Sequence, residues 1–221
     1  LFWWQKGIDV DPNYPTNYYW ASRENKRLGN WFNAMLYGEV FCSLEMRTGD
    51  ARAMAESLGA LWSEVFGFEL GPTGADQPKI QLQRGGPTTS LDDGSLMDTL
   101  DVIFQVAATL RLEENEDWPS QQMTLQEHYR LRALIGSLWM RTDNQYRGHY
   151  ALFSRWNKLE REGLLEAYVY WLLGFEDEER SRQWAIANSE VVSRFYAYLE
   201  SHPLEFGNVR TLNKELKDAH H

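Results

Sequence analysis

The sequence predicts an all-α fold of antiparallel helical hairpins, with one long irregular loop at about residues 68–95. Apolar residues recur at helical spacing over most of the chain. Hydroxyl and acidic residues occur at positions where helix N-termini need caps. Glycines and prolines are concentrated in residues 68–95. With 221 residues, 43% of them hydrophobic, the chain can bury one large core or two small ones packed together.

Residues 1–67 form the first predicted unit, a set of N-terminal helical hairpins. LFWWQKGIDVDP, at 1–12, is typical of the end of a helix, so we expect the native N-terminus to be missing. Helices are predicted over 17–47, with a break at 28–30, and over 50–66.

Residues 68–95 contain three prolines, five glycines and no helical period. An irregular connection of this length is either a functional lid or a linker. Within it, KIQLQ at 79–83 alternates apolar and polar residues, which favours a short extended piece or hairpin. We place the boundary between two helical parts here.

Residues 96–221 form the C-terminal helical part, which is either separate from 1–67 or continuous with it as one domain. Ser95 with Asp98, and Thr124 with Glu127, are capping pairs for the first two of its helices. His202-Pro203 separates the last two, because proline disfavours a helical conformation in the preceding residue. The predicted helices span 96–112, 124–140, about 144–161, 163–174, 178–201 and 204–217.

Two segments share a pattern: SLEMRTGD at 43–50 and SLWMRTDN at 137–144. The same offset of 94 also superposes Leu58 on Leu152 and Trp62 on Trp156, which gives seven identities over 20 positions. The shared unit is the end of one helix followed at once by the start of another. Gly49 suits a left-handed C-cap and Asp50 the following N-cap, so the pattern indicates repeated architecture rather than an active signature.

RTGDARAMAESLGALW, at 47–62, resembles the inter-helix turn and second helix of tetratricopeptide-type (TPR) repeats. KGIDVDPNYP, at 6–15, is similar to the end of such a repeat, where a proline closes the second helix. The resemblance implies a right-handed, TPR-like array of helical hairpins. No clean 34-residue period runs through the chain, so a two-part helical bundle is the alternative.

Composition excludes several classes of function. A net charge of −10 argues against broad attraction to nucleic acid or anionic membranes, and Cys42, the single cysteine, excludes an internal disulfide and a cysteine-based metal cluster. No stretch approaches the roughly 20 apolar residues of a membrane span. We expect a soluble chain without a bound cofactor or metal; cytoplasm and periplasm both remain open, as does the oligomeric state.

Residues 124–161 carry seven Lys or Arg against three Asp or Glu, interleaved with aromatic residues. Such a mixture suits contacts with an anionic ligand. The candidate ligand-binding residues here are His128, Arg130, His149 and Arg155. The competing interpretation, which we favour, is that the arginines pair with the acidic segments 113–117 and 176–179 and cover aromatic core edges with their stems.

The aromatic content is high, with ten Trp, eleven Tyr and ten Phe. Many of these residues will fill the core, but several cluster near the N-terminus. Tyr18, Tyr19 and Trp20 are our candidates for partner binding, because aromatic side chains dominate protein-binding hot spots. This cluster either lines a groove or packs against a missing segment.

The sequence therefore favours a non-enzymatic helical scaffold that mediates protein or peptide interaction, with no specific nucleic acid partner. It contains no HExxH motif, no EF-hand loop and no Walker motif, and we assign no catalytic residue. The alternative is a helical domain that binds or processes an anionic ligand near residues 128–155, gated by the 68–95 loop.

Overall fold

In the computed structural model, the regular elements of the described residues are helices, as the sequence predicts, apart from one short β-hairpin. The structure describes residues 1–45, 48–66, 68–70, 76–78, 102–103, 106–107, 123–141 and 151–206. None of the helices in these ranges is both long enough and apolar enough to cross a membrane.

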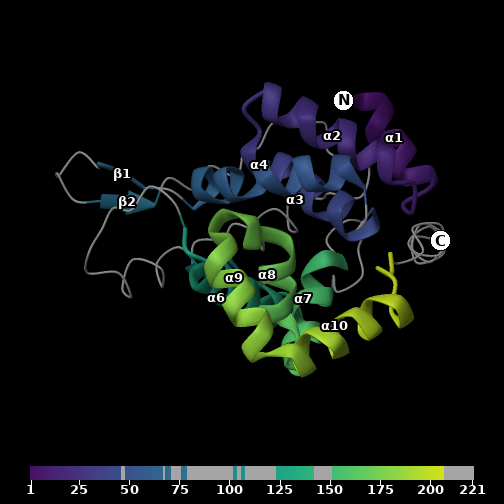
Figure 1. Cartoon of the computed structure of the whole chain (residues 1–221). Helices are drawn as coiled ribbons and strands as arrows, with labels where there is room; N and C mark the ends of the chain where they lie inside the picture. Colours follow the sequence, from purple (N-terminus) through teal and green to yellow (C-terminus); the bar gives the residue numbers. More distant parts are fainter. Residues whose placement is uncertain are drawn as a thin grey trace.

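The N-terminal part folds into the helices α1 (Phe2–Val10), α2 (Pro15–Arg27), α3 (Trp31–Leu44) and α4 (Gly49–Val65). Figure 1 shows them as one layer of the molecule. Pro15 occupies the first turn of α2, where its missing N–H costs nothing, and Gly29, with φ of 75°, makes the predicted break before α3.

The start of α4 corrects one local prediction. Thr48, not Asp50, is the N-cap, and its hydroxyl accepts a hydrogen bond from the Ala51 N–H at 3.1 Å. Gly49 is already the first residue of the helix, so it does not form a left-handed C-cap. Arg47 lies outside the described residues.

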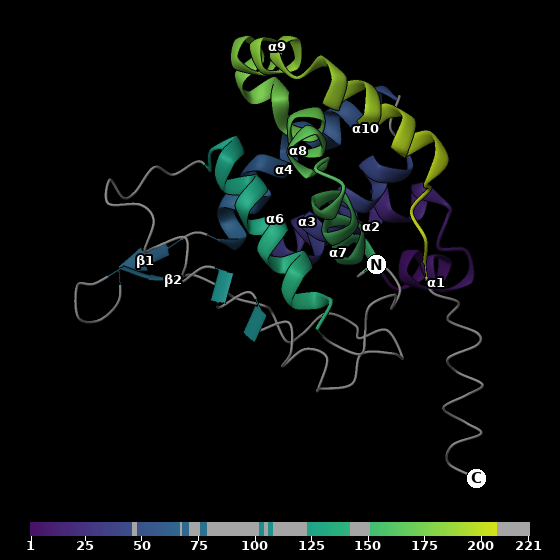
Figure 2. The same ribbon diagram turned by 90° about the horizontal axis from the view of Figure 1, so that it is seen from below.

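The C-terminal part supplies the second layer: α6 (Leu125–Trp139), α7 (Ala151–Arg161), α8 (Leu165–Leu173), the 3-10 helix η2 (Gly174–Asp177), α9 (Glu178–Ala187) and α10 (Ser189–Ser201). Figure 2 shows α10 crossing the molecule from α9 toward the N-terminal layer. The predicted capping box before α6 is confirmed, because the Thr124 and Glu127 side chains each bond to the other's backbone N–H.

Two helix predictions in this part need correction. The helix predicted over 178–201 is broken at Asn188, which lies between α9 and α10. Residues 204–206 are not helical, although a helix was predicted from 204; the rest of that prediction lies outside the described residues. The predicted stop before Pro203 is confirmed, because α10 ends at Ser201.

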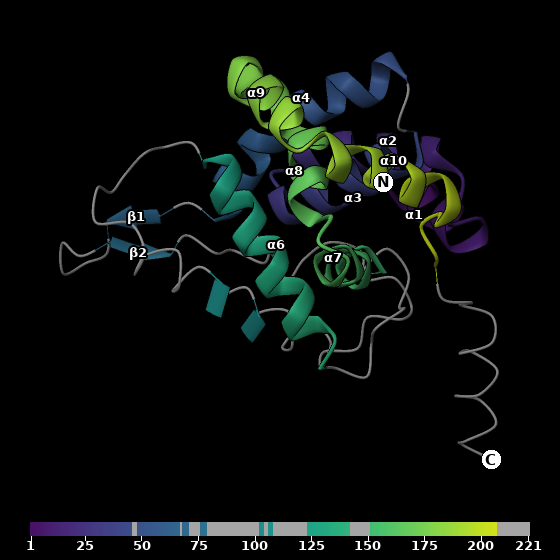
Figure 3. The same cartoon turned by 60° about the horizontal axis from the view of Figure 1, so that its bottom comes forward.

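The beginning of the predicted irregular loop contains an antiparallel hairpin of β1 (Phe68–Leu70) and β2 (Asp76–Pro78), in which Glu69 pairs with Gln77. Figure 3 shows this hairpin at the edge of the helical body. The extended piece predicted at 79–83 lies outside the described residues, as does most of the helix predicted over 96–112. Its described residues are helical, with Ile103 and Ala107 buried one turn apart.

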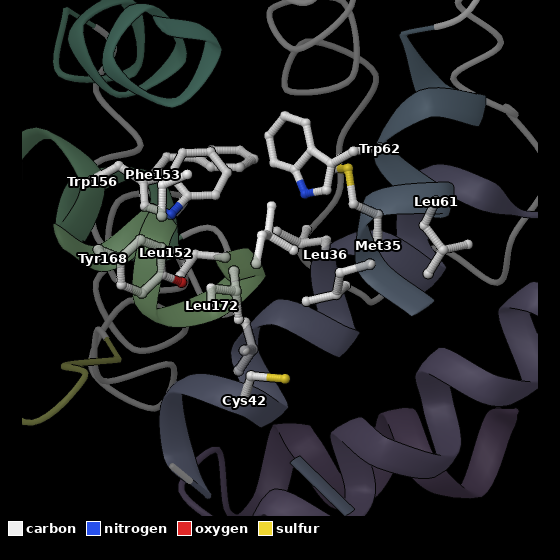
Figure 4. Packing of buried hydrophobic residues seen from close by; sticks show 14 of the residues in the cluster. Met35, Leu36, Cys42, Leu61, Trp62, Leu152, Phe153, Trp156, Tyr168 and Leu172 are labelled. Atoms are coloured by element: carbon white, nitrogen blue, oxygen red, sulfur yellow. The ribbon is translucent and has the colours of Figure 1, made fainter. Parts of the chain in front are cut away.

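One hydrophobic core joins the two layers, since α8 packs against both α4 and α6. Figure 4 shows Trp62 of α4 across from Phe153 and Trp156 of α7 and Tyr168 of α8. Within the C-terminal layer, α6 and α7 approach closely at Gly136. A Cβ there would lie 2.9 Å from the Asn157 backbone nitrogen and 3.0 Å from the Phe153 carbonyl oxygen, so only glycine fits without a shift.

Candidate functional site

A buried ion pair lies between the two layers. Glu39 of α3 and Arg132 of α6 are both fully inaccessible to solvent. Arg132 Nε donates to Glu39 Oε1 at 2.9 Å and Nη2 donates to Oε2 at 2.7 Å. This is the two-pronged geometry in which a guanidinium and a carboxylate bind most strongly.

Three further donors complete the hydrogen bonding of the Glu39 carboxylate. Trp62 Nε1 donates to Oε2 at 3.1 Å, Trp156 Nε1 to Oε1 at 3.0 Å, and the Tyr168 hydroxyl to Oε1 at 2.9 Å. The donors come from α4, α7 and α8, so the carboxylate ties together five helices. Burial and the nearby charge of Glu39 raise the pKa of Tyr168 well above its usual range, which keeps this hydroxyl a donor.

The guanidinium of Arg132 is satisfied by the same surroundings. Its Nη1 donates to the His128 carbonyl oxygen at 3.1 Å and lies 3.3 Å from His128 Nδ1. The Arg132 Cζ lies 3.9 Å from the ring centre of Trp62 and 5.5 Å from that of Trp156, so two aromatic rings face the cation. We name Glu39, Arg132, Trp62, Trp156 and Tyr168 the buried polar network.

This network is built for structure rather than for chemistry. Its residues are enclosed, and none of them lines either of the two described pockets. Each oxygen of the carboxylate accepts at least two hydrogen bonds, so no lone pair is directed at a substrate site. A fully satisfied buried network of this kind fixes one arrangement of the helices around it.

Sequence reasoning missed Glu39, although a signal for it exists. The segment FNAMLYGEVFCSL contains one acidic residue among apolar neighbours on every side, and nearly all of α3 is buried. A helix that is apolar all round lies within a core, and a charge there requires a partner. The sequence could not name that partner, because Arg132 is 93 positions away.

The repeat pattern coincides with the network. Leu58 and Leu152, which the offset of 94 superposes, are both fully buried. Trp62 and Trp156, the other superposed pair, both donate to Glu39. In addition, α3 packs on α4 and α6 packs on α7. Whether the two hairpins are a duplication stays a prediction.

The residues predicted to bind an anion are not brought together where the structure describes them. His128 is buried beside Arg132, whereas Arg130 is exposed on the same helix. Arg155 is buried on α7, where its Nη1 donates to the His202 carbonyl oxygen at 3.2 Å. His149 lies outside the described residues.

Two cationic residues of this region pair with acidic residues outside the two acidic segments. Arg132 pairs with Glu39, and Lys158 pairs with Glu205 at 3.2 Å. The acidic segment 113–117 lies outside the described residues, and Glu178 of the other segment lies 3.9 Å from Arg52 of α4. The covering of aromatic edges is seen at Arg132, which faces two tryptophan rings.

The three N-terminal candidates have different positions. Tyr18 is fully buried, and its ring stacks on Phe206 at 5.9 Å, so it cannot meet a partner directly. Tyr19 is half-buried and contacts the Trp20 ring edge-on at 5.2 Å. Trp20 is 41% exposed and stacks on Trp4 of α1 at 6.0 Å.

An aromatic surface continues from Trp20 onto α1. Phe2 and Trp3 are exposed, with their rings edge to face at 5.4 Å, and Trp3 is 75% exposed. Arg23 lies 5.5 Å from the ring centre of Tyr19 and 5.3 Å from that of Trp20. We define the N-terminal aromatic surface as Phe2, Trp3, Trp4, Tyr19, Trp20 and Arg23.

Cys42, on α3, is a buried free thiol. The Cys42 thiol is 1% exposed and donates to the Ala51 carbonyl oxygen at 3.4 Å. Burial, followed by the nearby charge of Glu39, raises the pKa of this thiol strongly, so the reactive thiolate is disfavoured.

Across the part of the chain that the structure describes, no three His, Cys, Asp or Glu residues are placed to hold a metal ion.

Comparisons with protein-family models, with curated proteins and with solved structures give no match for this chain.

Proposed function

We propose that this chain is a non-enzymatic helical scaffold that binds a protein or peptide segment through its N-terminal aromatic surface. The observation that carries the proposal is the exposure of large aromatic rings on two helices that pack together: Trp3 of α1 is 75% exposed and Trp20 of α2 is 41% exposed. Exposed aromatic groups of this size are costly to leave in water and are typical of binding hot spots.

The surface also suggests the chemistry of its partner. Arg23 lies against the Tyr19 and Trp20 rings, and Lys6 lies 4.9 Å from the centre of the Phe2 ring. Among the described residues, no carboxylate pairs with Arg23. A segment that carries apolar or aromatic side chains together with a carboxylate would match both the rings and this cation.

We further propose that the scaffold is a pair of TPR-like hairpins, α3 with α4 and α6 with α7. Support comes from the equal burial of Leu58 and Leu152 and from the shared acceptor of Trp62 and Trp156. The buried polar network would then join the two hairpins at equivalent positions.

The test is selection of peptides from a random display library on the whole chain, followed by titration of the enriched peptides. We expect enriched sequences that combine an aromatic residue with Asp or Glu. Trp20→Ala should weaken their binding at least about tenfold, as is usual for a hot-spot tryptophan. Arg23→Ala should weaken binding of the acidic peptides more than that of their Asn or Gln counterparts.

Tyr196→Ala is the matched control, because Tyr196 is an exposed aromatic residue (48%) on α10, outside the N-terminal aromatic surface. This variant should bind as the unmodified chain does. Selection of no peptide, or equal binding by Trp20→Ala, would contradict the proposal. So would concentration-dependent self-association in sedimentation that Trp3→Ala abolishes, because a second copy of the chain would then cover the surface.

A further inference from the structure

A cavity lies between the first half of α4 and the end of α8, outside the buried polar network. Its volume is about 390 Å³, which is in the range of binding sites for small molecules. By comparison, an apolar cavity of about 150 Å³ is enough to bind benzene. Arg52 belongs to the lining and is 69% exposed, so the cavity reaches the surface of the molecule.

Small side chains form the part of the lining that α3 and α4 contribute. Ala51 and Ala55 lie one turn apart on α4, and Cys42 of α3 lies beside them in the lining. Figure 4 shows Cys42 together with Leu172 of α8, which also lines the cavity. The space is therefore left open where alanine and cysteine stand in place of larger core residues.

Two aromatic side chains, Trp171 of α8 and Phe175 of η2, form the facing part of the lining. The Trp171 ring is held by two others, since its centre lies 5.7 Å from that of Tyr168 and 6.1 Å from that of Phe195. The Ser181 hydroxyl of α9 donates at 2.8 Å to the first carbonyl oxygen of η2 and fixes the turn that carries Phe175. These contacts hold the aromatic side in place around the cavity.

The polar groups of the lining already have partners within the chain. The Thr48 hydroxyl accepts a hydrogen bond from the Ala51 N–H at 3.1 Å. The Arg52 guanidinium, the one charged group among the described residues of the lining, lies 3.3 Å from Glu56 and 3.9 Å from Glu178. A bound molecule therefore needs to supply no charge, and a charged molecule would lose its hydration without gaining a free partner.

We propose that this cavity binds an uncharged aromatic small molecule of two or three rings, which lies against Trp171 and Phe175. Contact between aromatic rings and removal of apolar surface from water both favour such a molecule. The inference goes beyond the proposed peptide-binding function and does not depend on it. The cavity is formed by α3, α4, α8 and η2, whereas the N-terminal aromatic surface lies on α1 and α2.

The test is titration of the whole chain with N-phenyl-1-naphthylamine, an uncharged three-ring molecule whose fluorescence rises in apolar surroundings. We expect a saturable rise with one molecule bound per chain. Ala55→Leu places a larger side chain in the cavity and should weaken binding at least about tenfold, because the probe and the leucine would overlap. Ala53→Leu is the matched control: it is the same substitution at an exposed position of the same helix, and it should bind as the unmodified chain does.

Two further variants locate the bound probe. Trp171→Leu removes one ring from the lining and should weaken binding about threefold to tenfold, the usual contribution of one aromatic pair. Trp20→Ala alters the N-terminal aromatic surface and should leave binding of the probe unchanged. The two variants together separate the cavity from the surface.

Two naphthalene derivatives test the charge of the ligand. At pH 7, 2-naphthol is neutral and 2-naphthoate is an anion of similar size. We expect isothermal titration calorimetry to give the lower Kd for 2-naphthol, because Arg52 already lies near two carboxylates. Tighter binding of 2-naphthoate would contradict the assignment of an uncharged ligand.

Three results with the fluorescent probe would overturn the proposal. The first is the absence of a saturable response in the unmodified chain. The second is equal binding by the unmodified chain, Ala55→Leu and Trp171→Leu. The third is loss of the response in Trp20→Ala, which would place the probe on the N-terminal aromatic surface. Circular dichroism establishes the folding of Ala55→Leu; Trp171→Leu, at a half-buried residue, carries the test if Ala55→Leu is unfolded.

Discussion

Glu39 and Arg132 lie 93 positions apart in the sequence and form a two-pronged ion pair at 2.9 and 2.7 Å in the core. Neither side chain is exposed to solvent. The pair therefore joins the two layers of the molecule at a place where neither charge could be stable alone.

The first prediction concerns the coupling between these two residues. Arg132→Met leaves the Glu39 charge buried without its cation, so we expect it to lower the free energy of unfolding by about 3–5 kcal/mol. Glu39→Gln leaves Arg132 unpaired, with a comparable loss. Because the glutamine carbonyl oxygen can still accept from Trp156 and Tyr168, and the double variant buries no unpaired charge, it should lose much less than the sum. Urea unfolding of all four proteins measures this coupling; losses that add to within about 0.5 kcal/mol would contradict it.

The two tryptophans of the network should not be equivalent. Trp62→Phe and Trp156→Phe each remove one donor to Glu39, which should cost about 1–3 kcal/mol of stability. The Trp62 substitution should cost more, because its ring centre lies 3.9 Å from the Arg132 Cζ and that of Trp156 lies 5.5 Å away. Equilibrium unfolding measures both; a larger loss for Trp156→Phe would show that the hydrogen bond, not the cation contact, sets the difference.

Two glycine-to-alanine substitutions test the close approach of α6 and α7. Gly136→Ala places a Cβ 2.9 Å from a backbone atom of α7, so the two helices must separate, at a cost of about 1–3 kcal/mol. Gly49→Ala is the control: it is helical, nothing lies within 4 Å of the added Cβ, and we expect a gain of about 0.4–1 kcal/mol. Tm values of the two variants should move in opposite directions. Equal shifts would mean that α6 can move away from α7 without cost.

Two buried tyrosines should respond differently to loss of the hydroxyl. The Tyr168 hydroxyl donates to Glu39, so Tyr168→Phe should cost about 1–3 kcal/mol. The Tyr18 hydroxyl is buried with no partner, so Tyr18→Phe should be neutral or stabilising. The free energy of unfolding in urea distinguishes them. A loss for Tyr18→Phe as large as that for Tyr168→Phe would reveal a hydrogen bond at Tyr18.

Alkaline pH should weaken the fold through Tyr129. Burial, then its 2.9 Å hydrogen bond to Glu160 and the charge of that residue, raises the pKa of Tyr129 to about 12, against about 10 in an unfolded chain. Above about pH 10 the unfolded state therefore binds fewer protons than the folded state, and stability falls as pH rises toward 12. Unfolding at pH 9, 10 and 11 should show a shallower decline for Tyr129→Phe; an unchanged slope would exclude this residue as a cause.

Local sequence signals predicted the helix ends best. Thr124 and Glu127 are three residues apart and cap α6 with each other, so no tertiary information was needed. The start of α4 was misplaced because Thr48, Gly49 and Asp50 all suit a helix beginning, and the choice between them depends on the path of the chain. The break at Asn188 follows no proline or glycine, which is why helical spacing predicted one continuous helix there.

The candidate site was harder to predict, because its residues meet only in three dimensions. Arg132 and Trp156 were visible as members of a basic, aromatic region, but Glu39 was 93 and 117 positions away from them. His128 and Arg155, predicted to share a ligand, lie in different surroundings: His128 Nδ1 lies near Arg132 Nη1, and Arg155 donates to the His202 carbonyl oxygen. Helical periodicity shows which residues share a face, not which faces meet.

The positions of the buried polar network's residues along the sequence affect how the chain folds during synthesis. Three of the four partners of Glu39 follow it by 93, 117 and 129 positions, so α3 emerges from the ribosome long before Arg132, Trp156 and Tyr168 are made. Until then Trp62 is the one partner of Glu39 that has been synthesised. Burying the Glu39 carboxylate at that stage would therefore leave most of its hydrogen bonds unmade, at a high cost in free energy. We therefore expect the nascent N-terminal helices to stay loosely packed, and to need protection from aggregation, until α8 has left the exit tunnel.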